Sequence, residues 1–433
     1  MFIPMFIEQI MISGIGLFIT TVVKHSGMEA VAAVNLLNAL ALLFQQVFSS
    51  LGVGVTVIIA QFRGRGDSRA TGNAAVQSVV LVSLLSVATA AVCYLFMEPL
   101  LAAILQTAEP LVYEYGRIYL SYYIFSLPFV AIYLIASAAI RGSGHPSSSL
   151  WATLIQNGLY AILSIVSVRL LNAGLTGVGL SLLVSSVVAA IVGLVLLCRG
   201  NAHMRIERLT LKIDRTVARP IFRVGVPLLL EALLFQGGRL ITQTFAVPYG
   251  TQGMAANGIA NNIHTFTIVP GLTAANAAPA IVGRYCGQGD LEGANRKGKQ
   301  FIWLATILLL ISVVPSYIFM KPLVAMMTDA PEIQEMVYAI VTLSCIAVPV
   351  LWPLSFVTPA ILRSSGDGKY TSIVSVASML LMRVTIGYIL AHVLKIGVIG
   401  INLGMYADFF VRICFFYPRF RSGKWLQFHV LDE

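Results

Sequence analysis

The chain alternates between long apolar stretches and short polar connections. Twelve stretches of roughly 20 residues, dominated by apolar side chains, run near 2–23, 35–60, 76–96, 117–140, 150–171, 177–197, 220–246, 257–282, 301–319, 337–361, 372–394 and 398–417. A helix of about 20 residues crosses a hydrocarbon core about 30 Å thick. The stretches lack the roughly ten-residue alternation of membrane barrel strands. The pattern therefore predicts an all-α integral membrane protein with twelve transmembrane helices.

Composition supports a lipid environment. Of the 433 residues, 58% are hydrophobic and 11% are charged, and the mean hydropathy is +0.86. Soluble domains have about 25% charged residues, so the lipid bilayer is the expected partner of most of the surface. The five cysteines include no C-x-x-C pair, so neither a disulfide framework nor a metal site is predicted. We expect a monomer.

The basic residues indicate how the chain is oriented. The net charge is +10, but Lys and Arg are scattered through short loops, which argues against a nucleic-acid partner because such a partner needs a basic patch. Twenty Lys and Arg lie in one set of alternate loops and five in the other. Basic loops remain in the cytoplasm. We therefore expect a multi-pass protein of a bacterial-type inner (plasma) membrane with both termini in the cytoplasm.

The two halves of the chain repeat each other at an offset of 222 or 223 residues. The matched positions are Glu8 and Glu231, Asn38 and Asn261, "GRGD" (64–67) and "GQGD" (287–290), and Arg141 and Arg363. Six spans in each half, an even number, give both repeats the same orientation, as in secondary transporters. The expected organisation is two parallel-repeat six-helix bundles around a central cavity: an N-terminal lobe (1–197), a cytoplasmic linker (198–219), a C-terminal lobe (220–418) and a cytoplasmic tail (419–433).

Of the eighteen acidic residues, Glu8, Glu231 and Asp408 lie inside predicted spans. A charge at mid-membrane costs about 2.5–3.5 kcal/mol on insertion scales, and burial favours the protonated form of a carboxylate. These acids are therefore candidates for coupling to H⁺ or Na⁺, with Glu231 first because it lies deeper than Glu8. Alternatively, Glu8 and Glu231 each clamp a helix break near a proline, and Asp408 forms a structural ion pair with Arg383 or Arg412.

Polar residues within the spans are candidates for lining a substrate pathway. Asn257, Asn261 and His264 share one helix face, and the full set is Asn38, Gln46, Asn157, Asn257, Asn261 and His264. Interhelical hydrogen bonds, worth about 0.6 kcal/mol each in membranes, are the alternative for these side chains. Arg239 either compensates a carboxylate or lies near the outer surface, and a positive charge facing the cavity would oppose cationic substrates.

The sequence lacks the loop and catalytic motifs of several other functional classes. "GRGD" and "GQGD" do not continue as phosphate-binding loops, and tight turns suffice to explain them. No ATP-binding motif is present, so we expect no cofactor, and energy from an ion gradient. The spans contain no H-E-x-x-H, paired aspartates or G-x-S-x-G, which argues against an enzyme.

Several segments together resemble the multidrug and toxic compound extrusion (MATE) family. They are "IPMFIEQ", "GMEAVAAV", "IIAQFRGRGD", "RVGVPLLLEALLF", "GMAANGIANNIHTFTIVPG" and "GRYCGQGD". The resemblance implies a twelve-helix, two-lobed exporter that expels small cationic amphipathic drugs in exchange for entering Na⁺ or H⁺.

The chain also departs from that family. Many members carry an aspartate late in the first transmembrane helix, span 2–23 here, where this chain has Ile19. Many also carry an acid on the seventh, span 220–246 here, where this chain has Phe235, and Glu231 lies one turn earlier. Span 337–361 lacks the helix 10 acid of another branch. A lipid or polysaccharide-precursor flippase of the same superfamily is the alternative, although it would favour a cavity rich in Arg and Lys, and the spans offer Arg239, Arg383 and Arg412.

Overall fold

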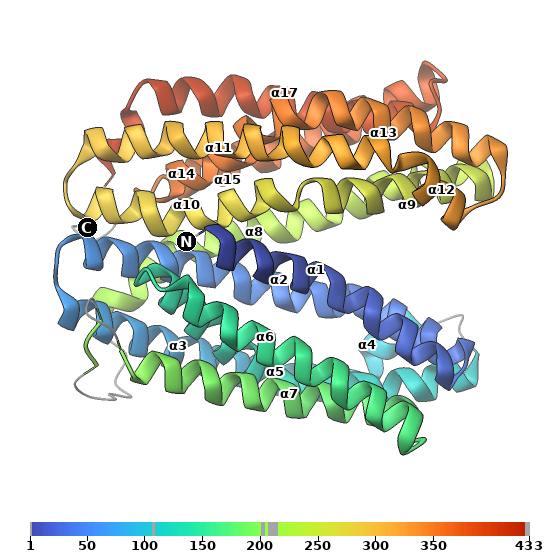
Figure 1. Ribbon diagram of the computed structural model, residues 1–433, viewed down its shortest axis with the longest axis horizontal. Coiled ribbons are helices and arrows are strands. Elements are labelled where there is room, and N and C mark those ends of the chain that lie inside the picture. Colours follow the sequence, from blue (N-terminus) through green and yellow to red (C-terminus); the bar gives the residue numbers. More distant parts are fainter. Residues whose placement is uncertain (1, 106–108, 201–203, 207–214, 429–433) are drawn as a thin grey trace. The chain divides into compact units, whose positions relative to one another are not determined.

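The computed structural model describes residues 2–105, 109–200, 204–206 and 215–428, which are mainly helical (Figure 1). The first helices are α1 (Phe2–Val23), α2 (Met28–Gly64), α3 (Ser68–Leu95), α4 (Met97–Ile104), α5 (Pro110–Gly142), α6 (Pro146–Ile165) and α7 (Gly174–Cys198). They are followed by α8 (Arg215–Thr244), α9 (Gly250–Thr267), α10 (Val269–Gly287), α11 (Leu291–Ile318), α12 (Met320–Met327), α13 (Pro331–Trp352), α14 (Thr358–Arg363), α15 (Gly368–Ser378), α16 (Thr385–Tyr388) and α17 (Val398–Arg421). The predicted all-α fold is confirmed.

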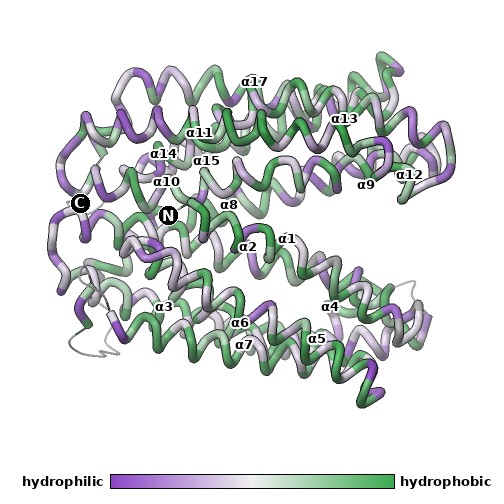
Figure 2. Tube along the Cα trace, viewed as in Figure 1, coloured by the Kyte–Doolittle hydropathy of each residue, from purple (hydrophilic) through white to green (hydrophobic). Residues whose placement is uncertain are grey.

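By length and composition, ten of the described helical runs could cross a membrane. Figure 2 shows hydrophobic residues along the long helices and hydrophilic residues concentrated at their ends. The two remaining expected spans, 220–246 and 257–282, coincide with α8 and with α9 plus α10. Helix α8 carries several charged side chains. The run of α9 and α10 is divided at Ile268, because Pro270 at the start of α10 disfavours continuous helix before it.

The described chain forms two compact units, Ile3–Gly225 and Val226–Glu433, with the boundary inside α8. In the first unit, α5 packs against α2, α3 and α7. In the second unit, α13 packs against α9, α11 and α17. Each of these helices occupies the repeat position of its counterpart, so the duplication extends from sequence to packing. The linker expected at 198–219 lies partly outside the described residues.

Two short helices, α4 and α12, were not expected from the sequence. Their bounds, Met97–Ile104 and Met320–Met327, are related by the same offset of 223 residues, as are the bounds of α3 and α11. Eight residues of helix span only about 12 Å, so these helices are too short to produce a transmembrane signal.

The "GRGD" and "GQGD" segments form matching turns. Asp67 accepts a hydrogen bond at 2.8 Å from the backbone N–H of Ala70, and Asp290 accepts one at 2.8 Å from that of Gly293. The preceding glycines, Gly66 and Gly289, have φ of 75° and 74°, a left-handed conformation that favours glycine. Each aspartate therefore caps the following helix.

Replacing Asp290 with alanine should remove this cap from α11. We expect the free energy of unfolding to fall by about 1 kcal/mol, the usual cost of losing a side-chain N-cap. Chemical unfolding in mixed micelles would measure the loss, with Asp290→Asn as the matched control because asparagine also caps helices well. An equal loss in both variants would contradict the capping role.

The second unit contains more interruptions than the first. The α2 helix is continuous where α9 and α10 are divided, and α5 is continuous where a π-helical turn (Pro353–Val357) separates α13 from α14. Further π-helical turns, at Met379–Val384 and Ile389–Val393, flank α16. Such turns often occur at functional sites, and two of them carry Phe356 and Arg383.

Candidate functional site

Glu8 lies in a three-residue cluster within the first unit. Nη1 of Arg141 donates to Oε1 of Glu8 at 2.9 Å and to the hydroxyl of Ser149 at 3.1 Å. The Ser149 hydroxyl lies 3.3 and 3.4 Å from the two carboxylate oxygens of Glu8. The Glu8 side chain is 8% exposed. These contacts join α1 to the last turn of α5 and the first turn of α6, and we call the three residues the N-terminal clamp.

Glu231 has the same partners in the second unit. Nη2 of Arg363 donates to both carboxylate oxygens of Glu231, at 2.8 and 2.6 Å. The hydroxyl of Ser372 donates to Oε2 at 2.9 Å. The Glu231 and Arg363 side chains are each 14% exposed. These contacts join α8 to the end of α14 and to α15, and we call Glu231, Arg363 and Ser372 the C-terminal clamp.

The two clamps are a duplicated feature. Arg141 and Arg363 are the repeat pair already visible in the sequence, and Ser149 and Ser372 are separated by the same 223 residues as the two glutamates. Both arginines were expected in loops and were not paired with the acids. The nearly equal spacing from acid to arginine in each half, 133 and 132 residues, is the signal that could have revealed the pairs.

Each clamp joins helices whose backbone is uninterrupted around the glutamate. Helices α1 and α8 run through Pro4 and Pro227 without interruption, so neither acid lies at a helix break. Charge-assisted hydrogen bonds between guanidinium and carboxylate are among the strongest in proteins. Each clamp therefore fixes the first helix of its repeat against two later helices of the same unit.

The serine hydroxyls should contribute unequally to the two clamps. We expect Ser372→Ala to reduce the free energy of unfolding by about 1.5 kcal/mol, the usual value for a hydrogen bond to a charged group. Ser149→Ala should cost less, because its hydroxyl lies 3.3 and 3.4 Å from the oxygens of Glu8. Parallel unfolding titrations would test this ranking, and a larger loss for Ser149→Ala would contradict it.

Asp408 forms a third ion pair, on α17. Nε of Arg412 donates to Oδ1 of Asp408 at 2.9 Å, and the hydroxyl of Ser378 donates to the same oxygen at 2.6 Å. Nη2 of Arg412 also donates to the backbone carbonyl of Ser375 at 3.1 Å. The side chains of Asp408 and Arg412 are 0% and 2% exposed. Of the two partners considered from the sequence, Arg412 forms the ion pair, whereas Arg383 makes no described hydrogen bond to Asp408.

Two guanidinium groups lie near the ring of Phe235. The Arg383 and Arg412 guanidinium carbons lie 5.4 and 5.3 Å from the centre of its ring, within the range of cation–π attraction. Arg412 also lies 5.4 Å from the ring of Phe356. Phe235 therefore occupies, with an aromatic ring, the position of α8 at which an acid would be expected from the family resemblance.

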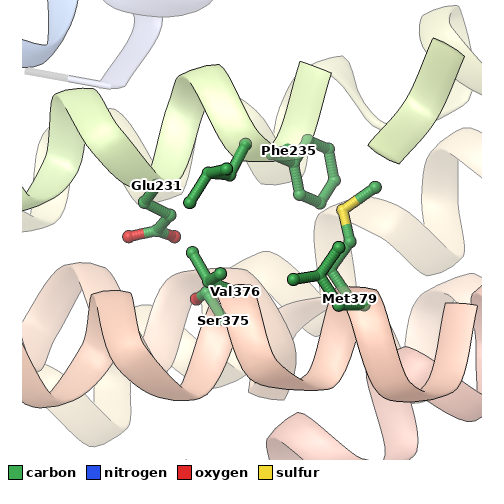
Figure 3. A pocket seen from close by; sticks show the side chains of 7 residues that line it. Glu231, Phe235, Ser375, Val376 and Met379 are labelled. Carbon is green, nitrogen blue, oxygen red and sulfur yellow. The ribbon is translucent and has the colours of Figure 1, made fainter. Parts of the chain in front are cut away.

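A narrow crevice lies beside the C-terminal clamp, between α8 and α15 with the π-helical turn that follows α15. Figure 3 shows Glu231 and Phe235 projecting from α8 toward Ser375, Val376 and Met379. This crevice is too narrow to hold a water molecule, and its lining consists of Glu231, Leu234, Phe235, Ser375, Val376, Met379 and Leu380. Ser375 also accepts the hydrogen bond from Arg412. Glu231 thus borders this crevice, and Ser375 in the same lining is bonded to Arg412 of the neighbouring ion pair.

The polar residues expected to line a pathway have diverse environments. Asn38 and Gln46 are exposed on α2, whereas Asn157 and Asn257 are buried. The side chain of Asn257 lies 3.5 Å from that of Asn402, a neighbour that was not predicted from the sequence. Asn261 and His264 are half-buried on α9.

The apolar position on helix 1 has a structural role in the first unit. Ile19 is 4% exposed and packs in a core cluster with Val22, Val23 and residues of α2 and α5. No acid is therefore available at this place, and Glu8 is the one carboxylate of α1. Among the described residues, no group of three or more His, Cys, Asp or Glu side chains could hold a metal ion.

Comparisons with known proteins agree with the duplicated fold. The "Uncharacterized transporter YisQ" of Bacillus subtilis is 26% identical over 98% of this chain and 93% of its own length. The "Probable multidrug resistance protein NorM" of Thermotoga maritima is 24% identical over 100% of this chain and 93% of its own. A crystal structure of MATE in the straight conformation has a TM-score of 0.89 at 23% identity, covering 98% of this chain and 95% of that one.

The family match itself follows the repeat. The family described as MatE matches residues 4–166 and again 227–389, so the second match begins and ends 223 residues after the first. Together the two matches cover well over half of the chain and contain both clamp glutamates and their partners. The chain belongs to the MatE family of multidrug-type transporters.

Proposed function

We propose that this protein is a secondary active multidrug exporter that expels organic cations in exchange for H⁺ or Na⁺ by alternating access. The multidrug resistance name of the relative from Thermotoga maritima supports the substrate class. The observation that carries the proposal is Glu231, a carboxylate enclosed by Arg363 and Ser372 at the edge of a crevice. We place both termini in the cytoplasm on the distribution of Lys and Arg.

The C-terminal clamp suggests how an ion could control the position of α8. Two unit charges about 4 Å apart attract with about 4 kcal/mol at an effective dielectric of 20. A proton or Na⁺ bound at Glu231 neutralises the carboxylate and removes most of its attraction for Arg363. The α8 helix is then released from α14 and α15. A cationic drug that needs the ionised carboxylate competes with that ion, which yields exchange.

Glu8 and Asp408 are the further candidates for coupling. Glu8 has the same kind of partners as Glu231, but the described crevice does not include it. Asp408 is fully buried, and its Oδ2 has no hydrogen-bond partner among the described residues, so this oxygen is where a proton would bind. Glu231 ranks first because of its position at the crevice.

Efflux from proteoliposomes tests the proposal. Purified protein is reconstituted, the vesicles are loaded with ethidium, and a Na⁺ or a pH gradient is imposed separately. We expect one gradient to accelerate ethidium efflux well above the rate of protein-free vesicles, and an ionophore that collapses the gradient to abolish the effect. Absence of efflux under both gradients would contradict an ion-coupled exporter of cations.

One observation favours the flippase alternative. Arg239 and Arg383 have no carboxylate within ion-pair distance among the described residues, so part of the positive charge inside the spans remains uncompensated. Movement of a fluorescent anionic lipid between leaflets, measured in the same vesicles, would separate this function from drug export.

A further inference from the structure

Inside the predicted spans, every carboxylate forms an ion pair with an arginine, but not every arginine has a carboxylate partner. Glu8, Glu231 and Asp408 are each bonded to one arginine. Arg239 on α8 and Arg383 in the π-helical turn Met379–Val384 remain, both in the second unit. Arg239 is exposed and Arg383 is half-buried, so the predicted spans of this unit carry positive charge that the described side chains do not neutralise.

The guanidinium of Arg383 is held in place without a strong partner. It lies over the ring of Phe235, 5.4 Å from the ring centre, and no described side chain or carbonyl hydrogen-bonds to it. A guanidinium has five N–H donors in a rigid fork, and the Arg383 residue is half-buried. Contact with an aromatic ring compensates only partly for a missing hydrogen-bond partner. The donors of Arg383 therefore remain available to a ligand.

The neighbours of Arg383 make its surroundings more positive. Arg239, Arg412 and Asp408 all interact electrostatically with Arg383. Three arginines and one aspartate leave a net charge of +2 at this place. His264 of α9 interacts electrostatically with Arg383 and Arg239, and its buried Nδ1 has no hydrogen-bond partner among the described residues. In a medium of low dielectric, such a group of charges attracts an oxyanion strongly.

Resting on the export function above, we propose that Arg383, with Arg239 and His264, forms an anion subsite for a carboxylate or phosphate group of an amphiphilic substrate. The planar fork of Arg383 fits either oxyanion with two parallel hydrogen bonds. The apolar part of the substrate packs on Phe235. Besides plain cations such as ethidium, the substrates would then include amphiphiles that carry an oxyanion, alone or together with an ammonium group.

The spacing on α8 explains why a zwitterion fits well. Glu231 and Phe235 are one helical turn apart and face the same side, as Figure 3 shows. Phe235 in turn lies beneath Arg383. An ammonium group near Glu231 and a carboxylate at Arg383 would then both lie next to this aromatic ring.

Binding measurements with matched ligands test the subsite. Full-length protein in phosphatidylcholine nanodiscs is titrated with norfloxacin, a carboxylate-bearing zwitterion, with its methyl ester, and with ethidium. We expect wild-type protein to bind norfloxacin about tenfold more tightly than the ester, as a charge-assisted pair predicts. Arg383→Gln should remove this preference and leave ethidium binding equal or improved, whereas Arg383→Lys should retain part of the preference.

Control measurements distinguish a specific effect of Arg383 from a general loss of positive charge. Arg117→Gln, which removes an exposed arginine paired with Glu98, should behave as wild type. Equal affinity of the wild type for norfloxacin and its ester would overturn the subsite, as would an unchanged preference in Arg383→Gln. Ethidium efflux from proteoliposomes that contain the same proteins tests the export function independently, because its failure would leave an observed carboxylate preference intact.

Changing the lipid of the nanodiscs shows whether the oxyanion belongs to a lipid headgroup or to a soluble ligand. The titrations are repeated in nanodiscs that contain phosphatidylglycerol. Competition by this lipid in the wild type, absent in Arg383→Gln, identifies a lipid headgroup as a ligand of the subsite. Undiminished norfloxacin binding in its presence identifies a soluble anionic amphiphile. Either result supports the subsite and decides which class of substrate uses it.

Discussion

Replacing Glu231 with glutamine is expected to reduce gradient-driven ethidium efflux by about tenfold or more, the effect of losing roughly 1.4 kcal/mol of differential binding. Glutamine has nearly the same size and can still accept hydrogen bonds from Arg363 and Ser372 through its one oxygen. It cannot ionise, so it neither exchanges a proton nor attracts Na⁺ or a cationic drug. Initial efflux rates at equal protein density in the vesicles measure the effect.

Glu8→Gln is the matched control for this substitution. It changes the same residue type with the same partners in the other repeat, Arg141 and Ser149. Because the described crevice lies at Glu231, we expect the Glu8 variant to keep most of the efflux rate. Normal transport by Glu231→Gln would contradict the coupling role of this acid, and a greater loss for Glu8→Gln would move that role to the first unit.

Replacing Arg412 with methionine is expected to lower the free energy of unfolding by about 3–5 kcal/mol. The change leaves the fully buried Asp408 without its ionic partner. It also removes the hydrogen bond to the carbonyl of Ser375 and the contacts with Phe235 and Phe356. Unfolding by denaturant titration in mixed micelles would measure the loss.

The double variant Asp408→Leu/Arg412→Met identifies the physical origin of that effect. If the unpaired carboxylate causes the loss, removing both charges should restore most of the stability, since apolar residues of similar volume often replace a buried pair at little cost. A double variant as unstable as Arg412→Met alone would show instead that the stacking and backbone contacts of Arg412 dominate.

Most of the fold could be predicted from the sequence, because the features that determine it are local or repeated. Apolar runs indicate helices that need a lipid environment, and the 223-residue offset identifies the duplication without knowledge of any contact. The pair Asp408 and Arg412 was likewise accessible, because residues four apart on a helix face each other. The short helices α4 and α12 were missed, since eight residues do not produce a recognisable span.

The clamps could not be derived from local pattern. Glu8 and Arg141 are 133 residues apart and Glu231 and Arg363 are 132 apart, and such pairings depend on how whole helices pack. From the sequence, an arginine at the end of a span is also assigned to the loop, because the apolar run stops there. The repeat relates one clamp to the other, but only the structure shows which side chains meet.

The two positions at which this chain differs from the family pattern have structural roles. Ile19 contributes to the core of the first unit, and Phe235 supports two guanidinium groups. Both replacements exchange a carboxylate for an apolar side chain. The acids inside the spans predicted from the sequence are then all paired with arginines, which makes competition between an ion and an existing pair the natural form of coupling.

Competition between a cationic drug and the coupling ion for Glu231 underlies the proposed exchange, and ion release on drug binding detects it. Ethidium is added to purified protein, and released protons are followed with a pH dye in weakly buffered solution, while released Na⁺ is followed with a radioactive tracer. Wild type and Glu8→Gln should release one of these ions, and Glu231→Gln should release neither. Equal release from Glu231→Gln would contradict competition at this carboxylate.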